Sequence, residues 1–88
     1  MDLTDYRNKL DGIDAQILAL FKERMETVAD IAAFKRENGL PVFAAGREKE
    51  ILDRVRKESG EDLAPYAVSL FETLMYLSRE YQKTLLND

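Results

Sequence analysis

The stretch LALFKERMETVADIAAFK, Leu18 to Lys35, decides how this chain folds. Its apolar residues recur every three or four positions, which is the spacing of one face of an α-helix. Arg24 and Lys35 fall on that same face, at positions where a helix normally places core residues. The stretch therefore predicts a helix that aims two cations at the interior of the protein.

The predicted helix extends beyond this stretch in both directions. Asp2 or Thr4 can cap its start, and Gly39 followed by Pro41 ends it. Roughly 33 helical residues at 1.5 Å each make a helix about 50 Å long. A compact globule of 88 residues has a diameter of only about 31 Å. Because the helix is longer than its own domain, we expect a second chain to cover its far half.

Two shorter helices are expected after the long one. The second runs from about Ala45 to Glu58, and the third begins between Leu63 and Pro65 and runs to about Leu86. No window shows the sustained alternation of a strand. The sequence therefore predicts an all-α fold of three helices, one of them very long, that forms a homodimer, with residues 1–88 as one domain.

Composition excludes several classes of function. The chain has no Cys and no His, which rules out thiolate metal sites and His-based acid-base catalysis. Its net charge of −4 argues against a nucleic-acid binder that uses a broad basic face. No apolar run approaches the roughly 20 residues that span a bilayer, and the first residues lack the pattern of a signal peptide. We therefore expect a cytoplasmic protein that binds neither nucleic acid nor membranes.

Polar side chains also interrupt the apolar faces of the other two helices. Glu48 lies three and seven residues before Ile51 and Val55, so a carboxylate shares their face. In the third helix, Ser78 and Gln82 replace core residues one turn apart. With the two cations of the first helix, each chain offers two cations, one carboxylate, one hydroxyl and one amide to its interior.

These residues have a structural and a functional explanation. A buried pair of Arg24 and Glu48, with the other polar residues fixing helix register, would need no ligand. However, ions without water cost several kcal/mol each unless they are paired, and the excess positive charge favours a pocket for a small anion. Arg7 lies seventeen residues before Arg24, about 25 Å along the helix and about 100° around it. Only a partner chain could bring Arg7 to this pocket.

Four segments resemble the all-helical chorismate mutases. YRNKLDGIDAQILALFKERM is similar to the N-terminal signature of that family, and VADIAAFK to the run that leads to its lysine. GREKEIL is similar to the start of its second helix, and LFETLMYLSREYQ to its serine-to-glutamine segment. The similarity spans nearly the whole chain with matching spacing. It implies an intertwined homodimer with two active sites, which isomerises chorismate to prephenate in aromatic amino acid biosynthesis.

The resemblance implies roles for the inward cations and the amide. Arg24, together with Arg7 of the partner chain, would bind the substrate carboxylates. Lys35 and Gln82 would be the catalytic residues that donate to the ether oxygen, and Lys35 would also reach a carboxylate. The rearrangement breaks one C–O bond and forms one C–C bond without moving a proton. It therefore needs positioning and charge stabilisation, and no metal or cofactor is expected.

The resemblance implies roles for four further residues. Glu48 would accept a hydrogen bond from the ring hydroxyl, and Ser78 would lie at the ring carboxylate. Arg47 matches a basic residue beside the site. Ala44 departs from the family, which commonly has an Asp there, near the substrate hydroxyl. Its backbone could still serve in substrate binding, but a side-chain contribution is lost.

Three alternatives remain open from the sequence. The chain could be a lyase of the same fold that eliminates pyruvate from isochorismate. It could be a non-catalytic helical dimerisation module that binds an acidic metabolite, a reading that the missing Asp at Ala44 allows. It could also be the mutase part of a longer enzyme, such as a chorismate mutase/prephenate dehydratase.

Overall fold

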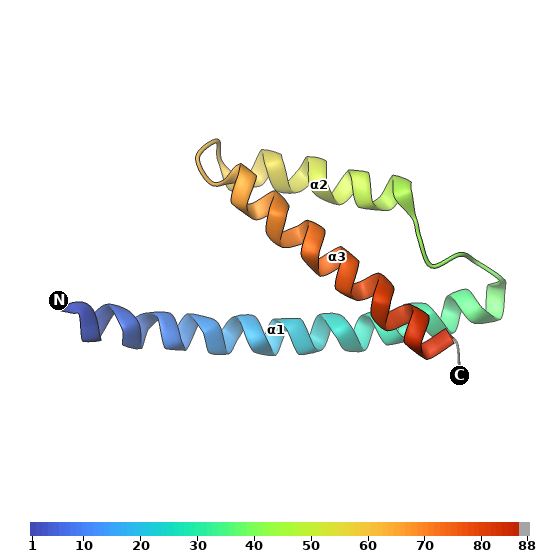
Figure 1. Ribbon diagram of the computed structural model, residues 1–88, viewed down its shortest axis with the longest axis horizontal. Helices are drawn as coiled ribbons and strands as arrows, with labels where there is room; N and C mark the ends of the chain where they lie inside the picture. Colours follow the sequence, from blue (N-terminus) through green and yellow to red (C-terminus); the bar gives the residue numbers. More distant parts are fainter. Residues whose placement is uncertain (87–88) are drawn as a thin grey trace.

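The computed structural model describes residues 1–86 as three helices (Figure 1). They are α1 (Leu3–Asn38), α2 (Ala45–Ser59) and α3 (Ala64–Leu86). The described residues contain no strand, so the predicted all-α fold with one very long helix is confirmed. The predicted helix bounds agree with these to within a residue or two. Asn87 and Asp88, which the predicted domain includes, lie outside the described residues.

Local chemistry explains where α1 begins and ends. The Asp2 carboxylate accepts from the Asp5 N–H at 3.0 Å, and the Asp5 carboxylate accepts from the Asp2 N–H at 3.1 Å. This reciprocal capping box satisfies amide groups that the first turn leaves unpaired. At the other end Gly39 adopts a left-handed conformation, with φ of 63°, which glycine reaches without steric cost. The chain can therefore turn sharply there, and Pro41 prevents the helix from resuming.

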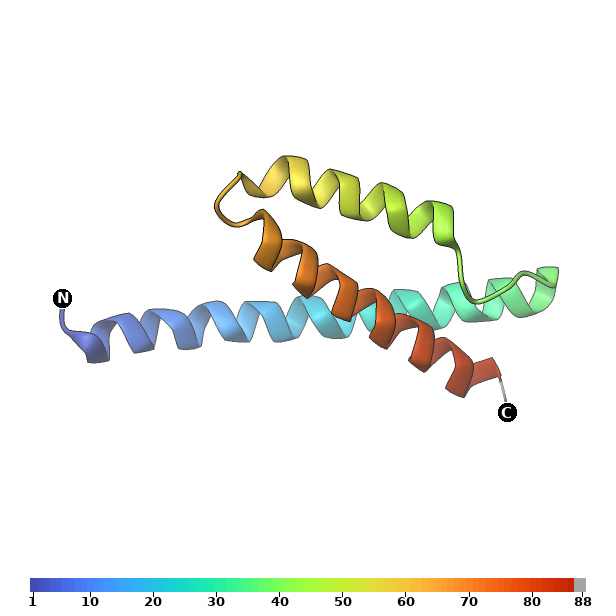
Figure 2. The same ribbon diagram turned by 45° about the horizontal axis from the view of Figure 1, so that its top comes forward.

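The third helix holds the fold together. Figures 1 and 2 show α3 running back across the C-terminal half of α1, with α2 on its other side. Among the described residues α3 packs on both α1 and α2, whereas those two do not pack on each other. The buried apolar residues lie along these two contacts; they are Val28, Ala32, Val55 and Met75. The remaining buried side chains, Ser78 and Gln82, are polar.

The single chain is elongated and leaves the first half of α1 exposed to solvent. It measures 54 × 28 × 14 Å, and its radius of gyration is 16.2 Å, against about 12 Å for a compact globule of this length. Every residue from 1 to 20 is exposed. The exposed residues of this segment include seven large apolar side chains on α1: Leu3, Tyr6, Leu10, Ile13, Ile17, Leu18 and Leu20. The long helix thus extends well past the part of the chain that covers it.

None of the helices within residues 1–86 combines the length and the apolar character that crossing a membrane requires.

Candidate functional site

A cavity of about 540 Å³ lies where the C-terminal half of α1, the start of α2 and the middle of α3 face one another. The polar residues that interrupt the predicted apolar faces all line it. They are Arg24, Lys35, Glu48, Ser78 and Gln82, and Ala44 and Arg47 also contribute to the wall. The apolar part of the wall includes Leu20, Val28, Ile31, Val42, Ile51 and Met75. The two inward cations of α1 therefore line a cavity and not a packed core.

Arg24 and Ser78 form the first polar pair of the wall. Arg24 Nη1 donates to Ser78 Oγ, and that hydroxyl donates in turn to the Leu74 carbonyl at 2.8 Å. Ser78 is buried, with 7% of its surface exposed. Because a guanidinium carries five N–H donors, one bond orients Arg24 and leaves other donors for an anion.

Lys35 and Gln82 form the second pair. Lys35 Nζ donates to Gln82 Oε1 at 3.0 Å and to the Val42 carbonyl at 2.7 Å. An ammonium group has three donors and no acceptor, so it fixes which end of the Gln82 amide faces it. The third Lys35 proton and the two N–H groups of Gln82 then remain as donors. Two separate donors thus lie side by side in one wall, on a buried amide and a partly buried ammonium.

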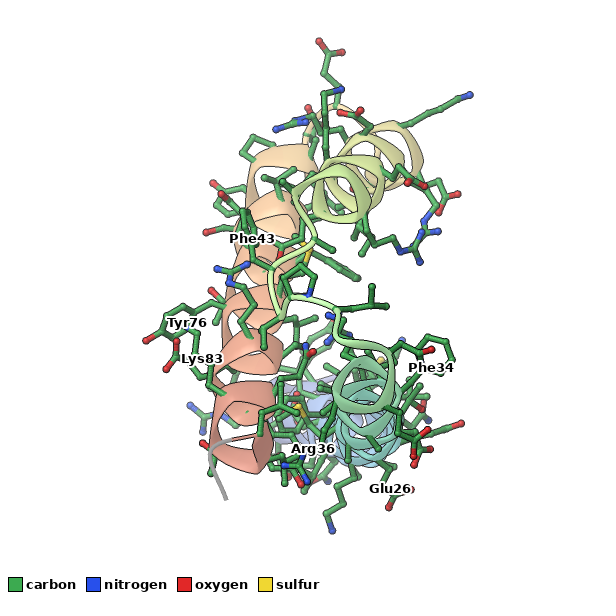
Figure 3. All side chains as sticks on the ribbon, turned by 90° about the vertical axis from the view of Figure 1, so that its right-hand side faces the viewer. Glu26, Phe34, Arg36, Phe43, Tyr76 and Lys83 are labelled. Carbon is green, nitrogen blue, oxygen red and sulfur yellow. The ribbon has the colours of Figure 1, made fainter. Side chains whose placement is uncertain are left out.

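Glu48 is paired with Arg79, a residue that the sequence pattern does not predict. Arg79 Nη1 lies 2.5 Å from Oε1 and 2.6 Å from Oε2 of Glu48, and the two side chains are only 25% and 21% exposed. Arg79 Cζ also lies 5.4 Å from the centre of the Phe43 ring. Figure 3 shows Phe43 beside α3, close to where the loop enters α2.

This pairing replaces the Arg24–Glu48 pair that was considered as a structural explanation. In the structure Glu48 is paired from α3, and Arg24 is bonded to Ser78. The available signal for Arg79 was its place three residues before Gln82, where both side chains share one flank of a helix. Its partner, however, lies thirty-one residues away in the sequence.

The charged residues of the cavity give it a positive balance. Four cations and two carboxylates line it, for a net charge of +2 in a chain whose overall charge is −4. These charged residues are Arg24, Lys35, Arg47 and Arg79 with Glu23 and Glu48. Such a balance suits a small molecule that carries two negative charges.

Two predicted site residues differ from the rest: Ala44 lines the cavity without a polar side chain, and Arg7 does not line it. Ala44 is the N-cap of α2 and offers no side-chain hydrogen bond to the first turn, so both the cap and the family's carboxylate are missing there. Arg7 is exposed near the far end of α1 and does not line the cavity. The single chain therefore brings together every predicted site residue except Arg7, which was expected to come from a partner.

Comparison with known proteins identifies the family of the chain. The model of the chorismate mutase type II family matches residues 6–83. A chorismate mutase of Methanocaldococcus jannaschii is 34% identical over 88 residues, which cover 98% of this chain and 89% of that protein. A bifunctional chorismate mutase/prephenate dehydratase of Buchnera aphidicola is 31% identical over 88 residues, 98% of this chain and 23% of that protein.

A shorter match extends to another protein. The T-protein of Haemophilus influenzae is 35% identical over 57 residues, which cover 65% of this chain and 15% of that protein. The chain thus spans less than a quarter of this relative and of the Buchnera enzyme. No solved structure gives a significant match. The family model covers nearly the whole chain, and the chain therefore belongs to the chorismate mutase type II family.

Proposed function

We propose that the chain is an isomerase that converts chorismate to prephenate in this cavity, on the route to phenylalanine and tyrosine. The observation that carries the proposal is one cavity in which three helices present the family's polar residues, with a net charge of +2. Chorismate carries two carboxylates, which match that charge. Its rearrangement transfers no proton, so the site needs no residue that acts as a general acid or base.

The cations of the site select the reactive conformer. Arg24 binds one carboxylate of chorismate, and Arg7 of a second copy binds the dianion from the other side. Holding both carboxylates brings the two reacting carbons together, which removes much of the entropic part of the barrier. Ser78 orients Arg24 by accepting a hydrogen bond from its guanidinium, and it lies at the ring carboxylate. The ring hydroxyl donates to Glu48, beside the start of α2 at Ala44.

Lys35 and Gln82 stabilise the transition state. As the C–O bond breaks, negative charge grows on the ether oxygen, and the neighbouring N–H groups of the two side chains donate to it. One preorganised donor of this kind is worth about 3 to 4 kcal/mol. Two such donors supply most of the roughly 8 kcal/mol that a 10⁶-fold acceleration requires. The Lys35–Gln82 hydrogen bond of 3.0 Å keeps both donors in place before substrate arrives.

A homodimer is the proposed active form, because the single chain exposes too much surface. Its accessible area is 6928 Å², whereas a folded monomer of 10.1 kDa exposes about 5,300 Å². The excess of about 1,600 Å² per chain corresponds to an interface in the range of obligate dimers, about 2,000 to 5,000 Å² in total. Most of the exposed large apolar residues of α1 lie in its first half.

The register of the proposed dimer follows from Arg7 and Arg24. The two residues are equidistant from the point between Ala15 and Gln16. If two α1 helices pack antiparallel about a two-fold axis at that point, Arg7 of each chain is level with Arg24 of the other.

A second cavity, also of about 540 Å³, supports this register. It is lined mainly by apolar residues of α1 and α3: Ile17, Leu18, Leu20, Phe21, Leu70, Phe71 and Leu74. In the proposed register, Leu10 and Ile13 of the partner come level with Phe21 and Leu18. This cavity therefore suits the exposed apolar stripe of a second α1.

The test is a chorismate assay on the purified chain, followed as loss of the ultraviolet absorbance of chorismate with prephenate identified as the product. Release of pyruvate from isochorismate, without consumption of chorismate, would instead indicate the lyase. Binding of chorismate without turnover would indicate a non-catalytic module. The assay applies to residues 1–88 as one proposed domain, whether or not a longer protein contains it. A cytoplasmic location stays a prediction.

A further inference from the structure

Glu48 needs a partner to act as a fixed acceptor. It lies in the first turn of α2, which begins at Ala44 without a side-chain cap. A glutamate side chain has several rotatable bonds, and ordering a side chain of this length costs up to about 2 kcal/mol. An unpaired carboxylate in the cavity would also repel a substrate that carries two negative charges. Something must therefore orient Glu48 and offset its charge.

Arg79 meets both needs. Its Nη1 contacts both oxygens of Glu48, at 2.5 and 2.6 Å, while its guanidinium lies over the Phe43 ring at 5.4 Å. The cation is thus held between an aromatic face and a carboxylate. Each Glu48 oxygen has two lone-pair sites, so the contact with Arg79 leaves one on each oxygen for a further donor.

We propose that Arg79 is a positioning residue of the active site, which holds the Glu48 carboxylate in place to accept the hydroxyl of the substrate. The inference rests on the proposed function. Arg79 acts through Glu48, and the Phe43 ring keeps its guanidinium from swinging into solvent. Because the hydroxyl contact exists in both the bound substrate and the transition state, its loss weakens binding more than it slows the chemical step.

The first experiment compares three variants with the wild-type chain in the chorismate assay. Arg79→Met keeps most of the side-chain volume and removes the charge, and it should raise KM about tenfold with kcat within about threefold. Arg79→Lys can still contact both oxygens, so it should recover most of the loss. Arg56→Met is the matched control, because Arg56 belongs to an exposed pair with Asp53, with side chains 56% and 54% exposed. Its KM should stay within about twofold of wild type.

The second experiment separates a role through Glu48 from a role in folding. Glu48→Gln is made alone and together with Arg79→Met. Gln keeps an acceptor and loses the charge, so Arg79 has little left to hold or to offset. In the Glu48→Gln background, Arg79→Met should therefore change KM by less than about twofold. A residue that only holds the loop through Phe43, or that binds substrate directly, would show its full effect in both backgrounds.

The outcomes distinguish the inference from the function on which it rests. A wild-type chain that does not consume chorismate overturns the proposed function, and the inference falls with it. An active wild type whose KM is unchanged in Arg79→Met overturns the inference alone. An equal KM increase with and without the Glu48 carboxylate also overturns it, since Arg79 would then act independently of Glu48.

Discussion

The two halves of α1 differ in what covers them. Residues 3–20 are exposed throughout, although they carry the same apolar stripe as the rest of the helix. Residues 21–38 contain the buried Val28 and Ala32, and they supply Arg24 and Lys35 to the cavity wall. The periodicity of a helix therefore shows which face turns inward. It does not show whether the same chain provides the cover.

Ile13→Glu, in the exposed half of α1, should have the largest effect on assembly and activity. Ile13 belongs to the exposed stripe and lies close to the proposed two-fold axis, so the dimer would bury two carboxylates, each costing several kcal/mol. We expect sedimentation to show loss of the species near twice 10.1 kDa, together with loss of activity. Tyr66→Glu is the control, since Tyr66 is 74% exposed at the start of α3. An intact, active Ile13→Glu dimer would contradict the proposed interface.

Arg7→Ala and Arg24→Ala test whether the two halves work in one pocket across the dimer. Each homodimer should lose at least about a hundredfold in kcat/KM, because both of its pockets lack a carboxylate-binding Arg. In a heterodimer of the two, one pocket receives both defects and the other receives none. Refolding an equal mixture should give about half heterodimers and restore roughly a quarter of wild-type activity.

The same refolded mixture also tests the alternative, in which Arg7 and Arg24 act in the pocket of one chain. If Arg7 and Arg24 acted in the same chain's pocket, every pocket would carry one defect, and the refolded mixture would stay as inactive as its parents.

Gln82→Glu probes the covered half, where Lys35 holds the buried amide. A carboxyl group can donate to the ether oxygen only when it is protonated, and the neighbouring Lys35 cation favours its ionised form. At about pH 8 the variant should lose about 10² to 10³ in kcat, and it should recover activity toward about pH 5, nearer the range in which Glu titrates. A pH profile of kcat checks this, and equal activity at both values would count against Gln82 as the donor.

Ala44→Asp should have the smallest effect, because it adds a contact and removes none. A carboxylate at the N-cap of α2 can accept from the first turn, which Ala44 cannot do. We expect about 1 kcal/mol of added stability and a Tm higher by about 4 to 8 °C, measured by thermal unfolding. Ala45→Asp, at the first residue of the same helix, controls for the one added negative charge without occupying the N-cap position. A Tm unchanged in Ala44→Asp would show that this N-cap position is already satisfied.

The parts of the structure that depend on local sequence could be predicted. Asp2 and Gly39 fix the ends of α1 through nearby backbone groups, and the three- and four-residue spacing places Arg24 and Lys35 inward. Partner choice across helices could not be predicted in the same way. Glu48 was paired with Arg24 in the structural explanation, because nothing along the sequence favours Arg79, thirty-one residues away, until α2 and α3 are in place.

The hydrogen bonds of the site have a consequence for how the enzyme forms. Arg24–Ser78 joins residues fifty-four positions apart, and Lys35–Gln82 joins residues forty-seven positions apart, so both close most of the chain. Contacts of such long sequence separation require the largest loop closures and slow folding. Helical circular dichroism should therefore recover early after dilution from denaturant, through the local hydrogen bonds of each helix. Catalytic turnover should return last, once α3 has docked and the second chain has brought its Arg7 to the pocket, so that activity is the most stringent measure of complete folding and assembly.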